Sequence, residues 1–341
     1  MYQKKSRQCC AAMLIVSVCL RLCMFLGLDE KLGKFVIKVL QQPQTAQMLL
    51  YLETGQKAQL PVPQQDVVVI TKELPILQAE PIQTVDLQTV AAQEIMVGGG
   101  CSYPFDKQML LTQKSTLNLS EGAPLVLILH SHTTEAYSTG DGLKYTGISE
   151  YRTLDETYNV VAVGRALAET LRQNGIQVIH DTTVFDYPDY NSSYYNSLQR
   201  IEYWKSQYPG LQIIVDIHRD AVENEQGQAV ALLGEHDGQQ AAQLMLVVGT
   251  NEGGLEHPNW QENLANALKL QSVLLGEYPD LCRKLDLRTE RFNQHTAPGA
   301  ILVEVGTNGN TLTEAKTSAQ FLGQAMAKFL YALQSNDGVL P

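Results

Sequence analysis

The sequence has few of the features that mark disulfide-rich or nucleic-acid-binding proteins. Six cysteines occur among 341 residues, and four of them lie within the first 23 positions, so only Cys101 and Cys282 remain for the rest of the chain. Two isolated cysteines exclude a disulfide framework and a zinc site built on Cys-x-x-Cys pairs, although one bridge between them stays open. Lysine and arginine number 25 against 36 acidic residues, and this acidic balance argues against nucleic acid as the main partner.

Common catalytic motifs are also missing. The chain has no G-x-S-x-G motif of an esterase serine and no G-x-x-x-x-G-K-[ST] motif of a phosphate-binding loop. What is present is ordinary for a globular protein, with 44% hydrophobic and 18% charged residues. The length corresponds to roughly two domains, or to one large domain with attachments.

The amino-terminal segment is typical of a membrane anchor. Residues 9–28 form an apolar run interrupted only by Arg21, and the preceding residues include Lys4, Lys5 and Arg7 but no acid. The positive-inside rule predicts an anchor or signal over residues 1–28, with the rest of the chain on the extracytoplasmic side. A cleaved signal peptide is the competing interpretation, but no A-x-A site follows the run.

Composition divides the remainder of the chain into a spacer region and a globular domain. Residues 29–101 are predicted to form an amphipathic helix and a spacer rich in glutamine and proline, and residues 102–341 the catalytic domain. In that domain, apolar runs at 125–130, 176–181, 212–218, 244–250 and 300–306 alternate with helical patterns at 157–173, 192–207, 259–276 and 311–334. This alternation predicts an α/β fold with a mainly parallel, twisted central sheet flanked by helices.

Two local features refine this prediction. Thr153-x-x-Glu156 has the spacing of a capping box ahead of the first long helix. Residues 229–249 are expected to add two strands joined by a polar loop, so a hairpin would make the sheet mixed.

Polar side chains follow three of the predicted strands. His132 comes just after the first strand, His218 ends the third, and Glu304 lies within the last. The carboxyl ends of parallel strands meet at one edge of a sheet, and a carboxylate in an apolar strand requires a partner. Two imidazoles and nearby carboxylates suit a catalytic zinc ion. His180 is expected to have a structural role.

Several motifs together resemble the stage II sporulation protein P family. They are LILHSHTTEAY, YNVVAVGRAL, VDIHRDA, VVGTN and LVEVGTNGNTLTEA, spread in order over residues 105–333. The resemblance implies a zinc-dependent peptidoglycan hydrolase, related to the N-acetylmuramoyl-L-alanine amidases and with endopeptidase activity also attributed to it. It further implies a role in engulfment during sporulation, beside a lytic transglycosylase (SpoIID-like) and a membrane partner (SpoIIM-like).

The resemblance also assigns roles to residues. His132 and His218 correspond to zinc ligands, and Glu304 to the catalytic glutamate that takes the proton of water and returns it to the leaving amine. The third ligand stays open between Glu135 and Asp155, with His130 a lesser alternative. Arg219 and Asn308 are the expected substrate-binding residues. Two other functions are kept as alternatives: a non-catalytic wall-binding scaffold, and a zinc endopeptidase acting on peptides alone.

Overall fold

The computed structural model describes residues 87–119, 125–140, 142 and 144–340. The predicted anchor over residues 1–28 and most of the predicted spacer over 29–101 lie outside these residues. Within the described ranges, no helix is both long and apolar enough to cross a membrane. Cys101 and Cys282 are both free thiols, so the disulfide bridge that the sequence left open does not form.

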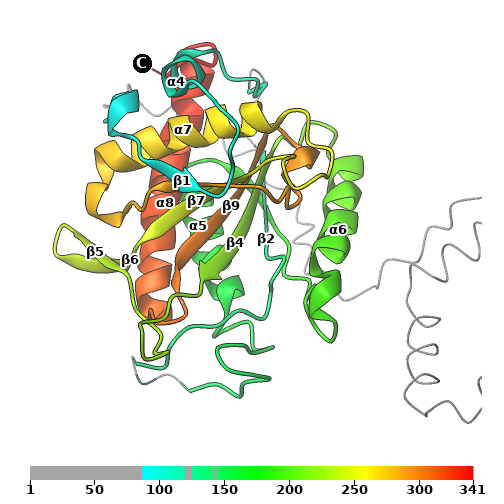
Figure 1. The fold of residues 1–341 in the computed structure, drawn as a ribbon, viewed down its shortest axis with the longest axis vertical. Helices are drawn as coiled ribbons and strands as arrows, with labels where there is room; N and C mark the ends of the chain where they lie inside the picture. Colours follow the sequence, from blue (N-terminus) through cyan, green and yellow to red (C-terminus); the bar gives the residue numbers. More distant parts are fainter. Residues whose placement is uncertain (1–86, 120–124, 141, 143, 341) are drawn as a thin grey trace, which may run out of the picture. The chain divides into compact units, whose positions relative to one another are not determined.

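A seven-stranded mixed sheet forms the centre of the described fold (Figure 1). Its strand order is β1-β8-β7-β9-β4-β2-β3. The strands are β1 (Val97–Gly99), β2 (Leu125–Leu129), β3 (Gln177–His180), β4 (Ile213–Asp220), β7 (Leu244–Gly249), β8 (Leu285–Arg288) and β9 (Gly299–Thr307). All neighbouring pairs are parallel except β7 with β9. The prediction of a mainly parallel sheet is confirmed, and its mixed character comes from that one antiparallel junction.

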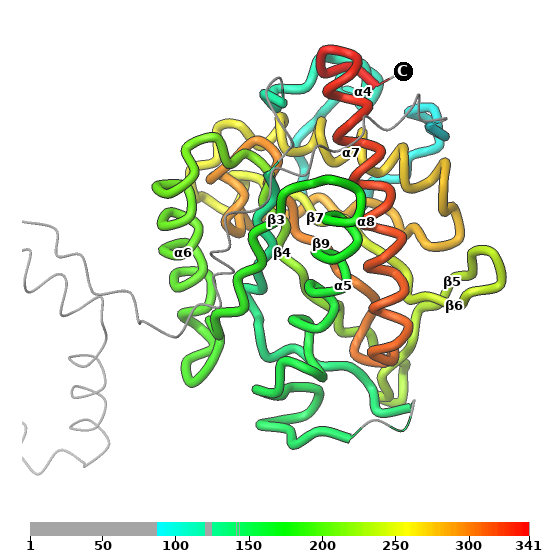
Figure 2. The backbone as a smooth tube through the Cα atoms, turned by 180° about the vertical axis from the view of Figure 1, so that it is seen from behind, coloured from blue at the N-terminus to red at the C-terminus, as the bar shows by residue number. Residues whose placement is uncertain are grey.

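Helices cover both faces of the sheet. The helices are α4 (Lys107–Thr112), α5 (Val160–Gln173), α6 (Ser193–Gln207), α7 (Trp260–Glu277) and α8 (Leu312–Ser335). The larger hydrophobic core joins α5, α7 and α8 to one face through strand residues such as Ile128, Val215 and Val303. Figure 2 shows α5 and α8 side by side over this face. Each fully buried aliphatic side chain contributes roughly 1.5–3 kcal/mol, so this core supplies most of the stabilisation.

The opposite face carries a smaller core under α6. Ile201 and Trp204 of α6 pack on Leu127, Leu129 and other residues of β2, β4 and β9. Side chains alternate between the two faces of a strand. His218 therefore lies on the same face as Ile214, which packs in this smaller core. The face under α6 is the one that carries the polar strand-end residues.

Side chains cap the starts of α4, α5 and α8. α8 begins with a capping box in which Thr311 and Glu314 exchange hydrogen bonds with each other's backbone. The capping box predicted at Thr153 is wrong, because α5 begins later, at Val160, and Asn159 accepts the hydrogen bond from Val161 N. Thr153 instead donates its hydroxyl to Thr146 O, within the loop before the helix.

Two further segments differ from the sequence prediction. The expected hairpin forms as β5 (Leu233–His236) and β6 (Gln239–Ala242), which make a separate two-stranded antiparallel sheet, while β7 joins the main sheet. The turn uses Asp237 and Gly238, both at positive φ, as a two-residue hairpin requires. Strand β1 pairs with β8, so the packed fold includes residues on the amino-terminal side of residue 102.

Candidate active site

The candidate site lies where β2, β4 and β9 end beside one another. These strands are parallel neighbours in the order β9-β4-β2, and His218 pairs in register with Glu304. The chain turns immediately after β2, where Glu135 N donates to His132 O. That turn returns both side chains toward β4. The three neighbouring strand ends therefore bring His132, His218 and Glu304 to one edge of the sheet, and the turn after β2 adds Glu135.

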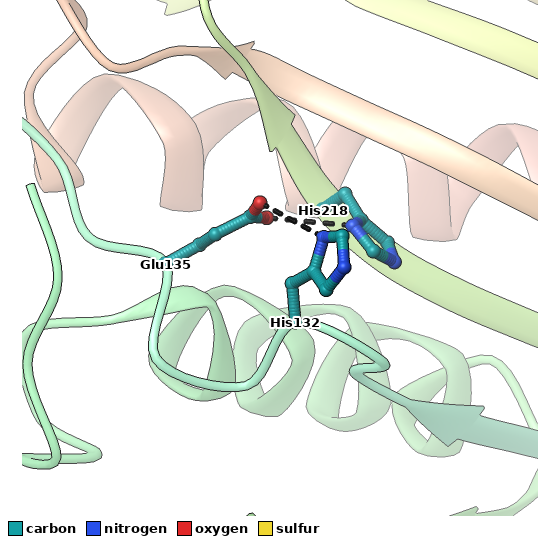
Figure 3. Close-up of side chains that lie close together, drawn as sticks. All are labelled: His132, Glu135 and His218. Carbon is teal, nitrogen blue, oxygen red and sulfur yellow. Dashed lines mark ion pairs between the residues drawn. The ribbon is translucent and has the colours of Figure 1, made fainter. Parts of the chain in front are cut away.

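His132, Glu135 and His218 lie close enough to share a metal ion (Figure 3). One ligand atom from each lies within 4.8 Å of the others, and among the described residues this is the one group of three with that property. The Glu135 carboxylate faces both rings from one side (Figure 3): its Oε1 is 3.3 Å from His132 Nδ1, and its Oε2 is 3.4 Å from His218 Nδ1. The ring centroids of the two histidines are 4.9 Å apart.

This donor set suits zinc. Two imidazole nitrogens and one carboxylate are a ligand combination of catalytic zinc sites that leave a position open for water. His218 and Glu135 are both buried, so their electrostatic interaction is weakly screened. No other described acid completes a larger cluster here, which is consistent with three protein ligands rather than four.

The carboxylates around His218 reverse the usual effect of burial on the pKa of a histidine. Burial by itself lowers the pKa of His218, but Asp216 and Glu135 outweigh it, so the pKa is raised well above the ordinary value. Burial would raise the pKa of Glu135, whereas His218, His132 and Arg219 hold it well below its usual range. The site therefore favours a bound positive charge beside an ionised Glu135, which a metal ion can provide in place of a proton.

Asp216 lies beside the ring nitrogen of His218 that faces away from Glu135. Its Oδ1 lies 3.0 Å from His218 Nε2, at ion-pair distance. The carboxylate also accepts hydrogen bonds from the backbone N and the hydroxyl of Ser131. A carboxylate behind a metal-binding imidazole fixes its tautomer and its ring orientation. Sequence reasoning missed Asp216, although a carboxylate two residues before His218 in an apolar strand was a visible signal.

Glu304 has the environment of a proton-transfer group. Its Oε2 is buried and has no hydrogen-bond partner in the described part of the chain. Burial raises the pKa of Glu304 to about 8; Glu135 and Asp220 add to the shift, while His218 and Arg219 oppose it. A glutamate whose pKa is moved toward neutrality is suited to general acid–base work.

The two other candidates for the third ligand lie elsewhere. Asp155 is exposed, and its Oδ1 accepts hydrogen bonds from the backbone and hydroxyl of Thr157. His130 turns toward α5, where its Nδ1 is 3.1 Å from Ile217 O and its Nε2 is 2.9 Å from His180 Nε2. Of the three candidates, only Glu135 lies with His132 and His218.

The two expected substrate-binding residues hold loops in place. The Arg219 guanidinium donates to the carbonyls of Ala136 and Tyr151, which ties the loop after β2 to β4. Asn308 is buried, and its Oδ1 accepts from Val222 N. Both side chains are engaged by the protein itself, so the structure places them around the site rather than open to a substrate.

Three more residues beside the site had no clear signal in the sequence. Arg152 lies 3.5 Å from Glu135 Oε1 and 2.8 Å from Asp186 Oδ2, so it links the two carboxylates. Tyr190 stacks on His132, with ring centroids 4.6 Å apart. Each of the three comes from a loop whose path depends on tertiary packing, which periodicity does not reveal.

Comparisons with known proteins place the chain in a family. The family model described as Stage II sporulation protein P matches residues 56–327. No curated protein matches the sequence. Solved structures with similarity include the N-acetylmuramoyl-L-alanine amidase AmiC2 of Nostoc punctiforme, at 15% identity and a TM-score of 0.36, covering 61% of this chain and 96% of that one.

Two clostridial structures are similar to the same degree. An N-acetylmuramoyl-L-alanine amidase from Clostridium difficile 630 has 16% identity and a TM-score of 0.37, covering 63% of this chain and 99% of that one. The CwlD amidase of Clostridioides difficile, solved in complex with the GerS lipoprotein, has 14% identity and a TM-score of 0.37, covering 61% and 98%. The family match extends over most of the sequence, and the chain belongs to the stage II sporulation protein P family.

Proposed function

We propose that this protein is a zinc-dependent peptidoglycan hydrolase that cleaves the amide bond between N-acetylmuramic acid and the stem peptide. The observation that carries the proposal is the group of His132 with the buried Glu135 and His218, and Glu304 on the neighbouring strand. Membership of the sporulation family supports a wall-remodelling role, and the acidic balance of the chain agrees with a partner other than nucleic acid.

The residues divide the chemistry between them. His132, Glu135 and His218 would hold the zinc ion, which when bound polarises the amide carbonyl and promotes ionisation of water. Glu304 takes the proton from the attacking water and returns it to the leaving amine. Its buried, unpartnered Oε2 is free to make that contact. Asp216 keeps the His218 ring in the orientation that presents Nδ1 to the site.

The finer parts of the proposal concern place and partners. We propose that the amino-terminal segment anchors the protein in the membrane and that the hydrolase domain acts outside the cytoplasm during engulfment. A lytic transglycosylase (SpoIID-like) and a membrane protein (SpoIIM-like) are the proposed partners. Cleavage of peptide cross-links is a second proposed activity of the same site.

Mass spectrometry of products tests the function directly. The purified full chain is incubated with purified peptidoglycan, with and without a zinc chelator, and the released fragments are identified. We expect glycan strands with free lactoyl ends and released stem peptides, both abolished by the chelator and restored by added zinc. A Glu304→Gln chain, which keeps the three proposed ligands, serves as the matched control and should release neither product.

The alternatives give different products. Split cross-links with stem peptides still attached to the glycan would make the protein an endopeptidase instead. Binding to peptidoglycan with no chelator-sensitive release, even when the proposed partners are added, would contradict the enzymatic function and support a wall-binding scaffold.

A further inference from the structure

Tyr190 lies over the candidate metal site although it comes from a different part of the chain. It begins a short 3-10 helix, Tyr190–Ser192, in the loop that follows β3. Its ring stacks on the His132 imidazole with an interplanar angle of 25°, and its hydroxyl lies 3.5 Å from His132 Nδ1. The same Nδ1 faces Glu135 Oε1. The hydroxyl therefore lies on the side of His132 that faces the proposed metal.

Other side chains hold the ring in this position. The guanidinium carbon of Arg152 lies 4.8 Å from the centre of the Tyr190 ring, at the distance of a cation–π interaction. Arg152 is itself fixed by a 2.8 Å ion pair with the buried Asp186 and by its contact with Glu135. Asp189 accepts hydrogen bonds from Asn191 N and Ser192 Oγ, which fixes the turn that carries the tyrosine.

Two neighbouring tyrosines differ from Tyr190 in their contacts with His132. Tyr194 also meets His132, but edge-on, with ring centroids 5.4 Å apart. Tyr187 is as exposed as Tyr190, at 49% against 47%, yet its side chain contacts neither a ring nor a polar group among the described residues. Tyr190 combines exposure to an incoming substrate with a hydroxyl at the site.

We propose that Tyr190 is a further catalytic residue, whose hydroxyl donates a hydrogen bond to the scissile carbonyl oxygen as negative charge develops on it. This inference rests on the proposed amide hydrolysis. Attack of water turns the carbonyl oxygen into an oxyanion, and a donor already aimed at that position stabilises the transition state more than the ground state. The tyrosine hydroxyl keeps its own proton throughout, because Glu304 carries out the proton transfer.

The Tyr190→Phe variant isolates the hydroxyl, since the ring and its stacking on His132 remain. With a soluble muramoyl-peptide substrate, we expect kcat to fall about 100-fold, the order found when one oxyanion donor is removed. KM and the zinc dissociation constant, measured by titration calorimetry of the metal-free chain, should each change less than about threefold on the same reasoning. Tyr187→Phe is the matched control and should leave kcat, KM and zinc affinity unchanged.

A binding measurement separates catalysis from structure. A phosphinate analogue of the tetrahedral intermediate should bind the Tyr190→Phe chain about 100-fold more weakly, while the unreacted substrate binds equally well. An unchanged kcat in Tyr190→Phe would overturn the inference, as would a loss of zinc affinity, which would make Tyr190 a ligand. If the wild-type chain itself releases no product, the proposed function fails and the inference falls with it; if only the variant comparison fails, the proposed function stands.

Discussion

Two pairs of histidines lie near the end of β2, and their surroundings differ sharply. His130 meets His180 beneath α5, where Gly164 leaves room for both rings. His132 meets His218 on the face that carries α6, and the Glu135 carboxylate contacts both rings. Burial lowers the pKa of His130 to about 4 and that of His180 well below its ordinary value, whereas carboxylates raise that of His218.

This difference shows that neighbouring carboxylates, rather than position in the sequence, decide what a histidine can do. His130 and His132 are two residues apart, yet the first is held neutral against Ile217 O and the second faces Glu135. Burial outweighs the nearby Asp216 and Asp181 at His130, so this pair stays neutral where α5 packs on the sheet. A pair surrounded by acids attracts a proton or a metal ion.

The largest effect is expected on zinc binding, which should depend on the pair of His132 and His218 and not on the pair of His130 and His180. His218→Gln should reduce bound zinc from about one ion per chain to none detectable, because it removes a proposed ligand, whereas loss of an orienting neighbour alone costs roughly 10–100-fold in affinity. The matched change in the other pair, His180→Gln, should leave zinc binding intact. Metal analysis after dialysis measures bound zinc in both variants. Equal loss of zinc in the two variants would contradict the difference between the two histidine pairs.

The next effect concerns Glu304, which shares the face of His218. Glu304→Gln should lower kcat on peptidoglycan fragments by about 10²–10⁴-fold, the usual contribution of a general acid–base group. Zinc content should stay at the wild-type level, because Glu304 is not among the three proposed ligands. Retained hydrolysis in this variant would show that another group accepts the proton.

The buried pair of His130 and His180 should make the free energy of unfolding depend on pH. The folded-state pKa of His130 is lowered to about 4 from 6.5, so the unfolded chain binds its proton more readily in acid. The corresponding stability is fully present above pH 6.5 and is lost as the pH falls toward about 4, by about 3 kcal/mol. Denaturant unfolding at pH values across this range should show that the free energy of unfolding falls less steeply with acid in His130→Gln than in the wild type. Identical pH dependence in the two proteins would contradict the lowered pKa of His130.

The Asp216→Asn change tests whether Asp216 supports the proposed metal-binding pair, His132 and His218. Asp216→Asn keeps the shape of the side chain but removes the charge beside His218, so zinc affinity should fall about 10–100-fold. Titration calorimetry of the metal-free chain measures this change. An unchanged affinity would mean that the orientation of His218 does not depend on Asp216.

The smallest effect is expected at Asp155. Its exposed carboxylate contacts Thr157 and lies outside the group of His132, Glu135 and His218, so Asp155→Asn should change the free energy of unfolding by less than about 0.5 kcal/mol. Zinc affinity should be unaffected. Glu135→Gln is the informative counterpart and should weaken zinc binding strongly; the reverse ranking of these two variants would assign the third ligand to Asp155.

Much of the fold was predictable because its strands and helices have strong local signals. The continuous apolar runs around Val126, Val215 and Val303 indicated buried parallel strands, and each lies in the sheet. Strand β1 was missed because Val97–Gly99 is short and glycine-rich, and only its pairing with β8 makes it a strand. The start of α5 was misplaced because Thr153 satisfies a loop carbonyl instead of the helix.

The site residues that lie on strands could be predicted from the sequence. The choice among residues that lie on loops could not. His218 and Glu304 lie on adjacent strands, so pattern and topology sufficed. The choice between Glu135 and Asp155 depended on the path of the loop after β2, which Arg219 fixes through carbonyls far away in sequence. No local pattern encodes such contacts, and Arg219 therefore looked like a substrate-binding residue.

Anomalous diffraction at the zinc absorption edge, from crystals of the zinc-loaded protein, tests most directly whether His132, Glu135 and His218 bind zinc. We expect a single strong peak among His132 Nδ1, His218 Nδ1 and the Glu135 carboxylate, at about 2.0–2.2 Å from each ligand atom. A peak between His130 and His180, or no peak at His132 and His218, would contradict it.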